Sequence, residues 1–127
     1  MTKRLMYIEL KSGYSDNGPA WIGLVTFSRT MRTVYFNNKA FGKKRWIGSN
    51  FYDIETGDEY WISGVKKNGE DRHWAGNGKI LIDRKIIDDY LKITGDETLD
   101  KSKFEITEIM ETRDKNDFVE IENQIKE

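Results

Sequence analysis

The side chains that commonly perform catalysis are scarce in this chain. It contains no cysteine and one histidine, His73, so a serine would have to act as any nucleophile. None of its six serines lies in the strand–turn–helix sequence that exposes a catalytic serine in hydrolases. His73 beside Trp74 in a predicted hairpin is typical of a packed structural histidine, although His73 with Asp71 or Asp53 would be the pair for a small hydrolase. The residue types therefore predict a protein without a catalytic site.

Motifs for metals and cofactors are equally sparse. The absence of cysteine excludes zinc–thiolate and iron–sulfur sites. Residues 64–70 have two glycines at phosphate-loop spacing, but Glu70 stands where such a loop requires lysine. Four acidic residues at one predicted turn could offer oxygen ligands to a hard cation: Asp53, Glu55, Asp58 and Glu59. Their spacing fits no EF-hand loop and favours a solvated turn, so the sequence predicts neither a metal nor a cofactor.

The chemistry that the chain does offer comes from basic side chains interleaved with tryptophans. Bases stack on exposed rings while lysine and arginine neutralise phosphates, which is what the binding of single-stranded nucleic acid requires. The alternative is that the tryptophans form the core and the cations lie around them. The candidate ligand-binding residues are Lys43, Lys44, Arg45, Trp46, Trp61, Lys66, Lys67, Arg72, His73 and Trp74.

The formal net charge of −1 hides an uneven distribution of charge along the chain. Residues 1–79 carry 13 Lys/Arg and 8 Asp/Glu, whereas residues 80–127 carry 8 Lys/Arg and 14 Asp/Glu. Most of the aromatic residues also lie in the first part. A basic, aromatic first part favours an anionic partner; the alternative is that the acidic second part covers it within the same molecule.

These residues must be positioned by one small domain, because 127 residues provide for a single core. Short alternating stretches separated by turn formers predict consecutive β-strands at 6–10, 21–28, 33–37, 50–54, 59–66, 71–75 and 79–82, with a loop at 41–48. Apolar residues at helical spacing predict a helix at about 84–94, capped by Asp83 and ended by Gly95. Residues 103–110 fit either a closing strand or a helix.

Short strands joined by tight turns and followed by one helix indicate a mainly β (α+β) fold. We expect a partly open SH3-like barrel with a C-terminal amphipathic helix, because closure removes exposed strand edges; a small twisted antiparallel sheet is the alternative. The domain would span residues 1–110. Residues 111–127 would form a charged tail that is frayed or partly helical.

The Asn68-Gly69 dipeptide is a strong signal for a β-hairpin with a type I′ turn. Such a turn would pair residues 60–65 with residues 71–75. In that register Ile62 faces the core, while Trp61 and Trp74 lie together with Arg72 on the outer face. We therefore expect a ligand-binding face built from this hairpin and the loop at 41–48.

Two stretches of the chain read YIELKSGYSDNGPAWIG (residues 7–23) and YWISGVKKNGEDRHWAG (residues 60–76). They resemble a family of small uncharacterised bacterial proteins, and the resemblance extends over about three quarters of the chain. It implies no established activity and no functional residue. Some similar chains carry the label deoxyxylulose-phosphate synthase, which this sequence does not support. A thiamine-diphosphate enzyme needs large domains and a Gly-Asp-Gly metal motif, and this chain is short and lacks that motif.

The resulting interpretation is a non-enzymatic binding module of the cytoplasm. No apolar run approaches the ~20 residues that span a bilayer, and the first residues lack the apolar segment of a signal peptide. The ligand would be single-stranded nucleic acid or an acidic protein segment. The alternative is a protein-interaction or toxin-antagonist protein whose acidic C-terminal part contacts a basic partner. The sequence does not indicate an oligomeric state.

Overall fold

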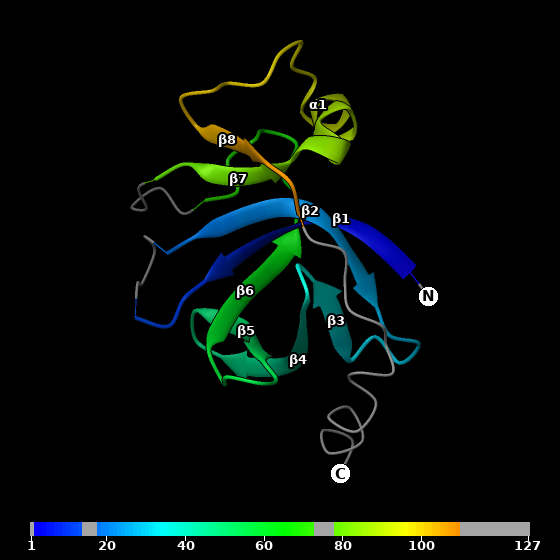
Figure 1. Cartoon of the computed structure of the whole chain (residues 1–127), viewed down its shortest axis with the longest axis vertical. Helices are drawn as coiled ribbons and strands as arrows, with labels where there is room; N and C mark the ends of the chain where they lie inside the picture. Colours follow the sequence, from blue (N-terminus) through cyan, green and yellow to red (C-terminus); the bar gives the residue numbers. More distant parts are fainter. Residues whose placement is uncertain (1, 14–17, 73–77, 110–127) are drawn as a thin grey trace.

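The structure, a computed structural model, describes residues 2–13, 18–72 and 78–109, except for the side chain of Trp46 (Figure 1). Its elements in chain order are β1 (Thr2–Leu10), β2 (Ala20–Phe27), β3 (Thr33–Phe36), β4 (Lys39–Trp46), β5 (Ser49–Asp53), β6 (Glu59–Gly64), β7 (Ile80–Asp83), the 3-10 helix η2 (Arg84–Ile86), α1 (Ile87–Thr94) and β8 (Phe104–Thr107). No helix of the described residues is long and apolar enough to cross a membrane. The tail predicted for residues 111–127 lies outside the described residues.

The first six strands form a closed antiparallel barrel. Each strand pairs with the next in the chain, and β1 closes the ring by pairing with both β2 and β6. β1 can serve two neighbours because it is long: it pairs with β2 over residues 2–9 and with β6 over residues 6–10. The predicted SH3-like barrel is thus confirmed, and it is closed rather than partly open. Closure leaves no unpaired edge within the ring.

Alternation along the strands fills the barrel with apolar side chains. Ile8, Phe41, Phe51 and Ile62 belong to one buried core, in which Phe41 packs edge-on against Tyr60 with ring centroids 4.7 Å apart. Ile109, at the end of the described chain, joins the same core. The chain therefore returns from β8 to the barrel, a contact that local sequence patterns do not reveal.

A second layer covers one outer side of the barrel (Figure 1). β7 pairs in parallel with β2, β8 pairs in parallel with β7, and α1 packs beside them. Asp83 accepts a hydrogen bond from the Lys85 amide at 3.1 Å, and Gly95 ends the helix with a φ of 81°. The predicted stop at Gly95 is confirmed, and Asp83 is a cap as predicted, but of η2, which leads into α1; α1 itself has no side-chain cap. Residues 104–107 adopt the strand rather than the helix alternative.

The strand β4 corrects the predicted loop at 41–48. It starts after a two-residue turn at Asn37 and Asn38, whose φ angles of 49° and 62° match a type I′ turn. Asparagine adopts this left-handed conformation more readily than most residues, so the Asn-Asn pair is a hairpin signal. The strand itself carries three consecutive cations in place of alternating apolar residues, which conceals its β character.

The predicted hairpin between residues 60–65 and 71–75 is wrong at Asp71 and Arg72, and residues 73–75 lie outside the described residues. One edge of β6 is paired with β1 along residues 60–64 and the other edge is paired with β5 at Glu59 and Tyr60, while the described residues Asp71 and Arg72 belong to no strand. The turn hydrogen bond joins Lys66 to Gly69, and Asn68 does not adopt the positive φ of a type I′ turn. The predicted faces of β6 are nevertheless confirmed, because Ile62 is 2% exposed and Trp61 is 38% exposed. Trp74 lies outside the described residues.

Candidate functional site

A β-bulge in β4 brings three cations to the border of one hollow. Lys43 pairs with Phe51 and Trp46 pairs with Ser49, so two residues of β4 face the single residue Asn50 of β5. In a regular strand, successive side chains point to opposite faces. Here Lys43, Lys44 and Arg45 instead line the same hollow, of about 380 Å³, together with Asn50 and Phe51.

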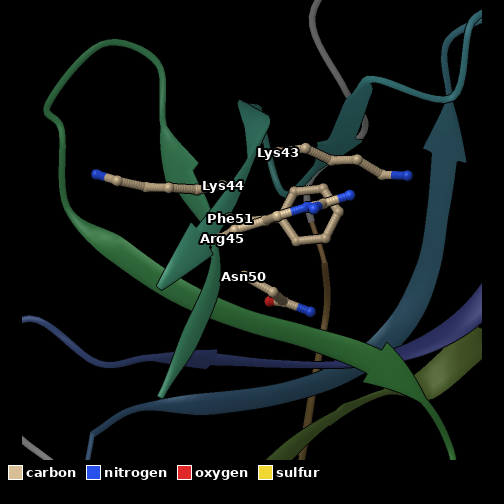
Figure 2. A pocket seen from close by; sticks show the side chains of 5 residues that line it. All are labelled: Lys43, Lys44, Arg45, Asn50 and Phe51. Carbon is tan, nitrogen blue, oxygen red and sulfur yellow. The ribbon is translucent and has the colours of Figure 1, made fainter. Parts of the chain in front are cut away.

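The walls of this hollow are held in place by the barrel. Phe51 is part of the barrel core. The Asn50 side-chain amide donates to the Ile62 carbonyl at 2.7 Å, and its oxygen accepts from the Ile62 amide at 2.8 Å. This pair of bonds ties β5 to β6 where the backbone ladder ends. Figure 2 shows Lys43 and Lys44 extending to opposite sides, with Arg45 and Phe51 between them.

The electrostatics of the hollow favour an anion. No acidic residue is among those that line it, and Lys43 and Arg45 form no ion pair with a carboxylate of the described residues. The Lys44 ammonium lies 5.2 Å from the centroid of the Tyr52 ring, a cation–π contact. Three cations around one concave surface can neutralise phosphate or carboxylate groups.

Trp61 lies one strand away from the hollow. The β5–β6 register pairs Phe51 with Tyr60, and its continuation places Asn50 opposite Trp61. The indole N–H of Trp61 donates to Ser63 Oγ at 3.2 Å, which fixes the ring on the outer face. An exposed ring beside a basic hollow is therefore available for stacking.

The other predicted site residues do not join this hollow. Lys66 and Lys67 are exposed, but their turn lies against α1, because a Cβ at Gly69 would be 3.6 Å from the Tyr90 hydroxyl. In Figure 1 this connection and α1 lie at the end of the molecule opposite β4 and β5. The predicted face that combines residues 41–48 with residues 60–75 is therefore divided. His73 and Trp74, and with them the hydrolase pair, lie outside the described residues.

Arg72 belongs to a second group of polar side chains, which we call the β1 polar cluster. Its members are Tyr7, Glu9, Lys11, Asp71, Arg72 and Tyr90. Glu9 is 1% exposed; it accepts a hydrogen bond from the Tyr7 hydroxyl and pairs with Lys11 at 2.9 Å. The Arg72 guanidinium donates to the Gly18 carbonyl at 3.1 Å. Burial first, and the bond to Glu9 second, raise the pKa of Tyr7 well above its ordinary value.

Asp71 links the turn after β6 to α1 within this cluster. Its Oδ1 accepts from the Lys66 amide at 2.7 Å, whereas neither its Oδ2 nor the buried Tyr90 hydroxyl makes a hydrogen bond of ordinary geometry. Burial raises the pKa of Asp71, against the lowering effect of the Lys66 amide. The pKa of Tyr90 is raised by burial and then by the nearby Asp71 carboxylate.

The acidic turn after β5 is built as a turn rather than as a metal site. Asp53 accepts from the Glu55 amide at 2.9 Å and pairs with Lys39 at 3.2 Å. Gly57 adopts the left-handed conformation expected for the hairpin turn, with a φ of 81°. In the part of the chain that the structure describes, no group of three or more acidic or histidine side chains is placed to hold a metal ion.

Comparisons with known proteins add no relative to this picture: no family model matches the chain, and no curated protein or solved structure is significantly similar to it. The resemblance to a family of uncharacterised bacterial proteins stays a prediction. The site must therefore be judged on its own geometry.

Sequence reasoning identified the cations of the hollow but not the residues that frame it. Asn50 and Phe51 lie in a predicted strand, yet nothing local indicates that Asn50 bonds to Ile62, twelve residues away along the chain. Trp46 lies in β4, and its side chain is not among those described. The usable signal is the run Lys43–Arg45 within a strand, since three like charges in succession are compatible with a strand mainly at a solvent-facing bulge.

Proposed function

We propose that the protein is a non-enzymatic binding module whose β4–β5 hairpin binds the backbone of single-stranded nucleic acid. The observation that carries this proposal is the bulge that gathers Lys43, Lys44 and Arg45 around one hollow without a lining acid. Lysine and arginine neutralise phosphates and release their counterions, which supplies the sequence-independent part of such binding.

Trp61 supports a single strand over other polyanions. Its ring is partly exposed on the strand next to Asn50, and unpaired bases stack on such rings for about 1–3 kcal/mol each. An acidic protein segment could use the same cations but would gain little from the ring. Binding of an acidic protein segment, the other predicted ligand, is therefore the alternative result that the test must distinguish.

The test is a titration of a fluorescently labelled oligothymidylate, followed by anisotropy at two salt concentrations. If three phosphates are neutralised, the slope of log affinity against log salt should be about −2, since each contact on a single strand contributes about −0.7. The variant with Lys43, Lys44 and Arg45 all changed to Gln should lose most of this slope. Trp61→Ala should weaken binding and leave the slope unchanged.

A matched control changes the same number of charges elsewhere. Lys92 on α1 and Lys101 and Lys103 before β8 are exposed, and their triple Gln variant lowers the net charge equally. Equal losses in the two triple variants would mean that net charge alone attracts the oligonucleotide, and would contradict the proposal. Binding of an acidic peptide with no dependence on Trp61 would assign the hollow to protein recognition instead.

A further inference from the structure

Ile47 at the tip of the β4–β5 hairpin is exposed in full. The other large apolar side chains that are exposed among the described residues, Leu24, Trp61 and Ile93, each keep about half or more of their surface covered. Single exposed apolar residues are common on protein surfaces. Full exposure of a β-branched side chain beside a binding hollow calls for a more specific account.

The turn chemistry makes Ile47 unusual. The preceding hairpin of the same barrel turns at Asn37 and Asn38, polar residues that suit a two-residue turn. The β4–β5 hairpin turns at Ile47 and Gly48, where Gly48 supplies the left-handed conformation with a φ of 81°. The turn therefore requires the glycine but not the isoleucine, whose side chain contributes nothing to the barrel core.

The position of Ile47 relates it to the hollow. It follows Arg45 by two residues, and the Trp46–Ser49 pair that it caps adjoins the bulge. We propose that Ile47 is a base-contacting residue: it packs against one unpaired base of a strand whose phosphates lie at Lys43 and Arg45. This inference rests on the proposed function. It adds a contact with the base, which the cations at the phosphates do not recognise.

A contact of this kind selects unpaired bases. In a duplex the base faces are covered by their neighbours, and an apolar side chain reaches them only by unstacking a step, which costs a few kcal/mol. In a single strand the face of a base is accessible. Ile47 would therefore increase the preference for single strands, whereas the three cations act on any phosphate backbone.

The experiment compares Ile47→Ser with the unmodified chain on three probes. These are an oligothymidylate, an abasic oligonucleotide of the same length, and inorganic polyphosphate, of which only the first has bases. Affinity for the oligothymidylate should fall roughly threefold to tenfold, because packing against one base removes only about half of the aliphatic side chain from water. Affinity for the other two probes should change less than about twofold, and the salt slope should stay the same.

Ile93→Ser is the matched control, because Ile93 is an exposed isoleucine on α1, away from the hairpin. Equal effects of Ile47→Ser on all three probes would overturn the inference while leaving the proposed function intact. A chain that binds none of the probes would remove the proposed function itself. Ile47→Ser that weakens binding to phosphatidylserine vesicles but not to oligothymidylate would assign the tip to a membrane surface and also overturn the inference.

Discussion

The basic hollow and the β1 polar cluster use charged residues in opposite ways. In the cluster, Glu9 is buried and faces both the Tyr7 hydroxyl and the Lys11 ammonium. In the hollow, three consecutive cations line one surface, with Lys43 and Lys44 extending to opposite sides (Figure 2), and no acidic residue lines it. Buried charge is tolerated only when it is paired, whereas like charges at the surface repel each other only weakly. The first arrangement serves the fold, and the second is available to a ligand.

This difference separates stability from binding. Residues of the cluster join the barrel to the connection after β6 and to α1, so their loss should be seen in the free energy of unfolding. The three cations of the hollow contribute little to folding, so their loss should be seen in ligand affinity. A natural protein keeps an unfavourable arrangement of like charges mainly where function uses it. The two regions can therefore be told apart by measuring both quantities on the same variants.

The largest effect on stability is expected for Glu9→Ala. The change leaves the Tyr7 hydroxyl and the Lys11 ammonium without their shared carboxylate, and removing one partner of a buried pair costs about 3–5 kcal/mol; the lower end is expected here because Lys11 is partly exposed. Urea denaturation followed by tryptophan fluorescence measures this loss. Glu105→Ala is the control, because Glu105 is exposed on β8. A loss below about 1 kcal/mol would mean that the cluster is not a stabilising unit.

A smaller effect is expected for Gly42→Ala beside the hollow. A methyl group at this position would lie 2.8 Å from three atoms of the Tyr52 side chain, so the ring must move away from Gly42 and from its contact with Lys44. Because Tyr52 is only half-buried, the ring can tilt outward, and the cost should be about 1–2 kcal/mol. Gly64→Ala is the control, since a methyl group there meets no described side chain within 4 Å. Equal stability of the two variants would show that Tyr52 does not pack on Gly42.

The barrel could be predicted from the sequence because most of its strands show local alternation between turn formers. β4 could not, since its bulge and its cations belong to the rim rather than to a packed face. The predicted pairing of residues 60–65 with residues 71–75 failed for a different reason. Asn68-Gly69 is a local signal, whereas the pairing of β6 with β1 joins residues about fifty positions apart.

The candidate site shows the same division between local and distant information. The cations Lys43, Lys44 and Arg45 can be read directly from the sequence, and so can the core-facing position of Ile62. The hollow exists only because the bulge redirects those cations and because Asn50 bonds to Ile62. A position such as Ile109 in the barrel core likewise depends on how the chain returns after β8.

The response of the β1 polar cluster to pH gives a third test, with Asp71→Asn. The pKa of Asp71 is raised in the folded chain, so its charge opposes folding above that pKa and not below the unfolded value of 3.8. The stability of the Asn variant relative to the unmodified chain should therefore increase as the pH rises from about 3.5 to 7. Denaturation of both proteins at several pH values measures this difference. A difference that stays constant, or that falls with rising pH, would contradict the burial of a charged Asp71.

The smallest effect on stability is expected for the Lys43, Lys44 and Arg45 triple Gln variant. Removing three neighbouring cations relieves their mutual repulsion and removes one cation–π contact, two surface effects of opposite sign that are each worth about 0.5–1 kcal/mol or less. The free energy of unfolding should therefore change by less than about 1 kcal/mol, while oligonucleotide binding is lost. The triple Gln variant of Lys92, Lys101 and Lys103 provides the reference for general charge effects. A loss of several kcal/mol would show that the cations are part of the fold, and the contrast between the two regions would then no longer separate binding from stability.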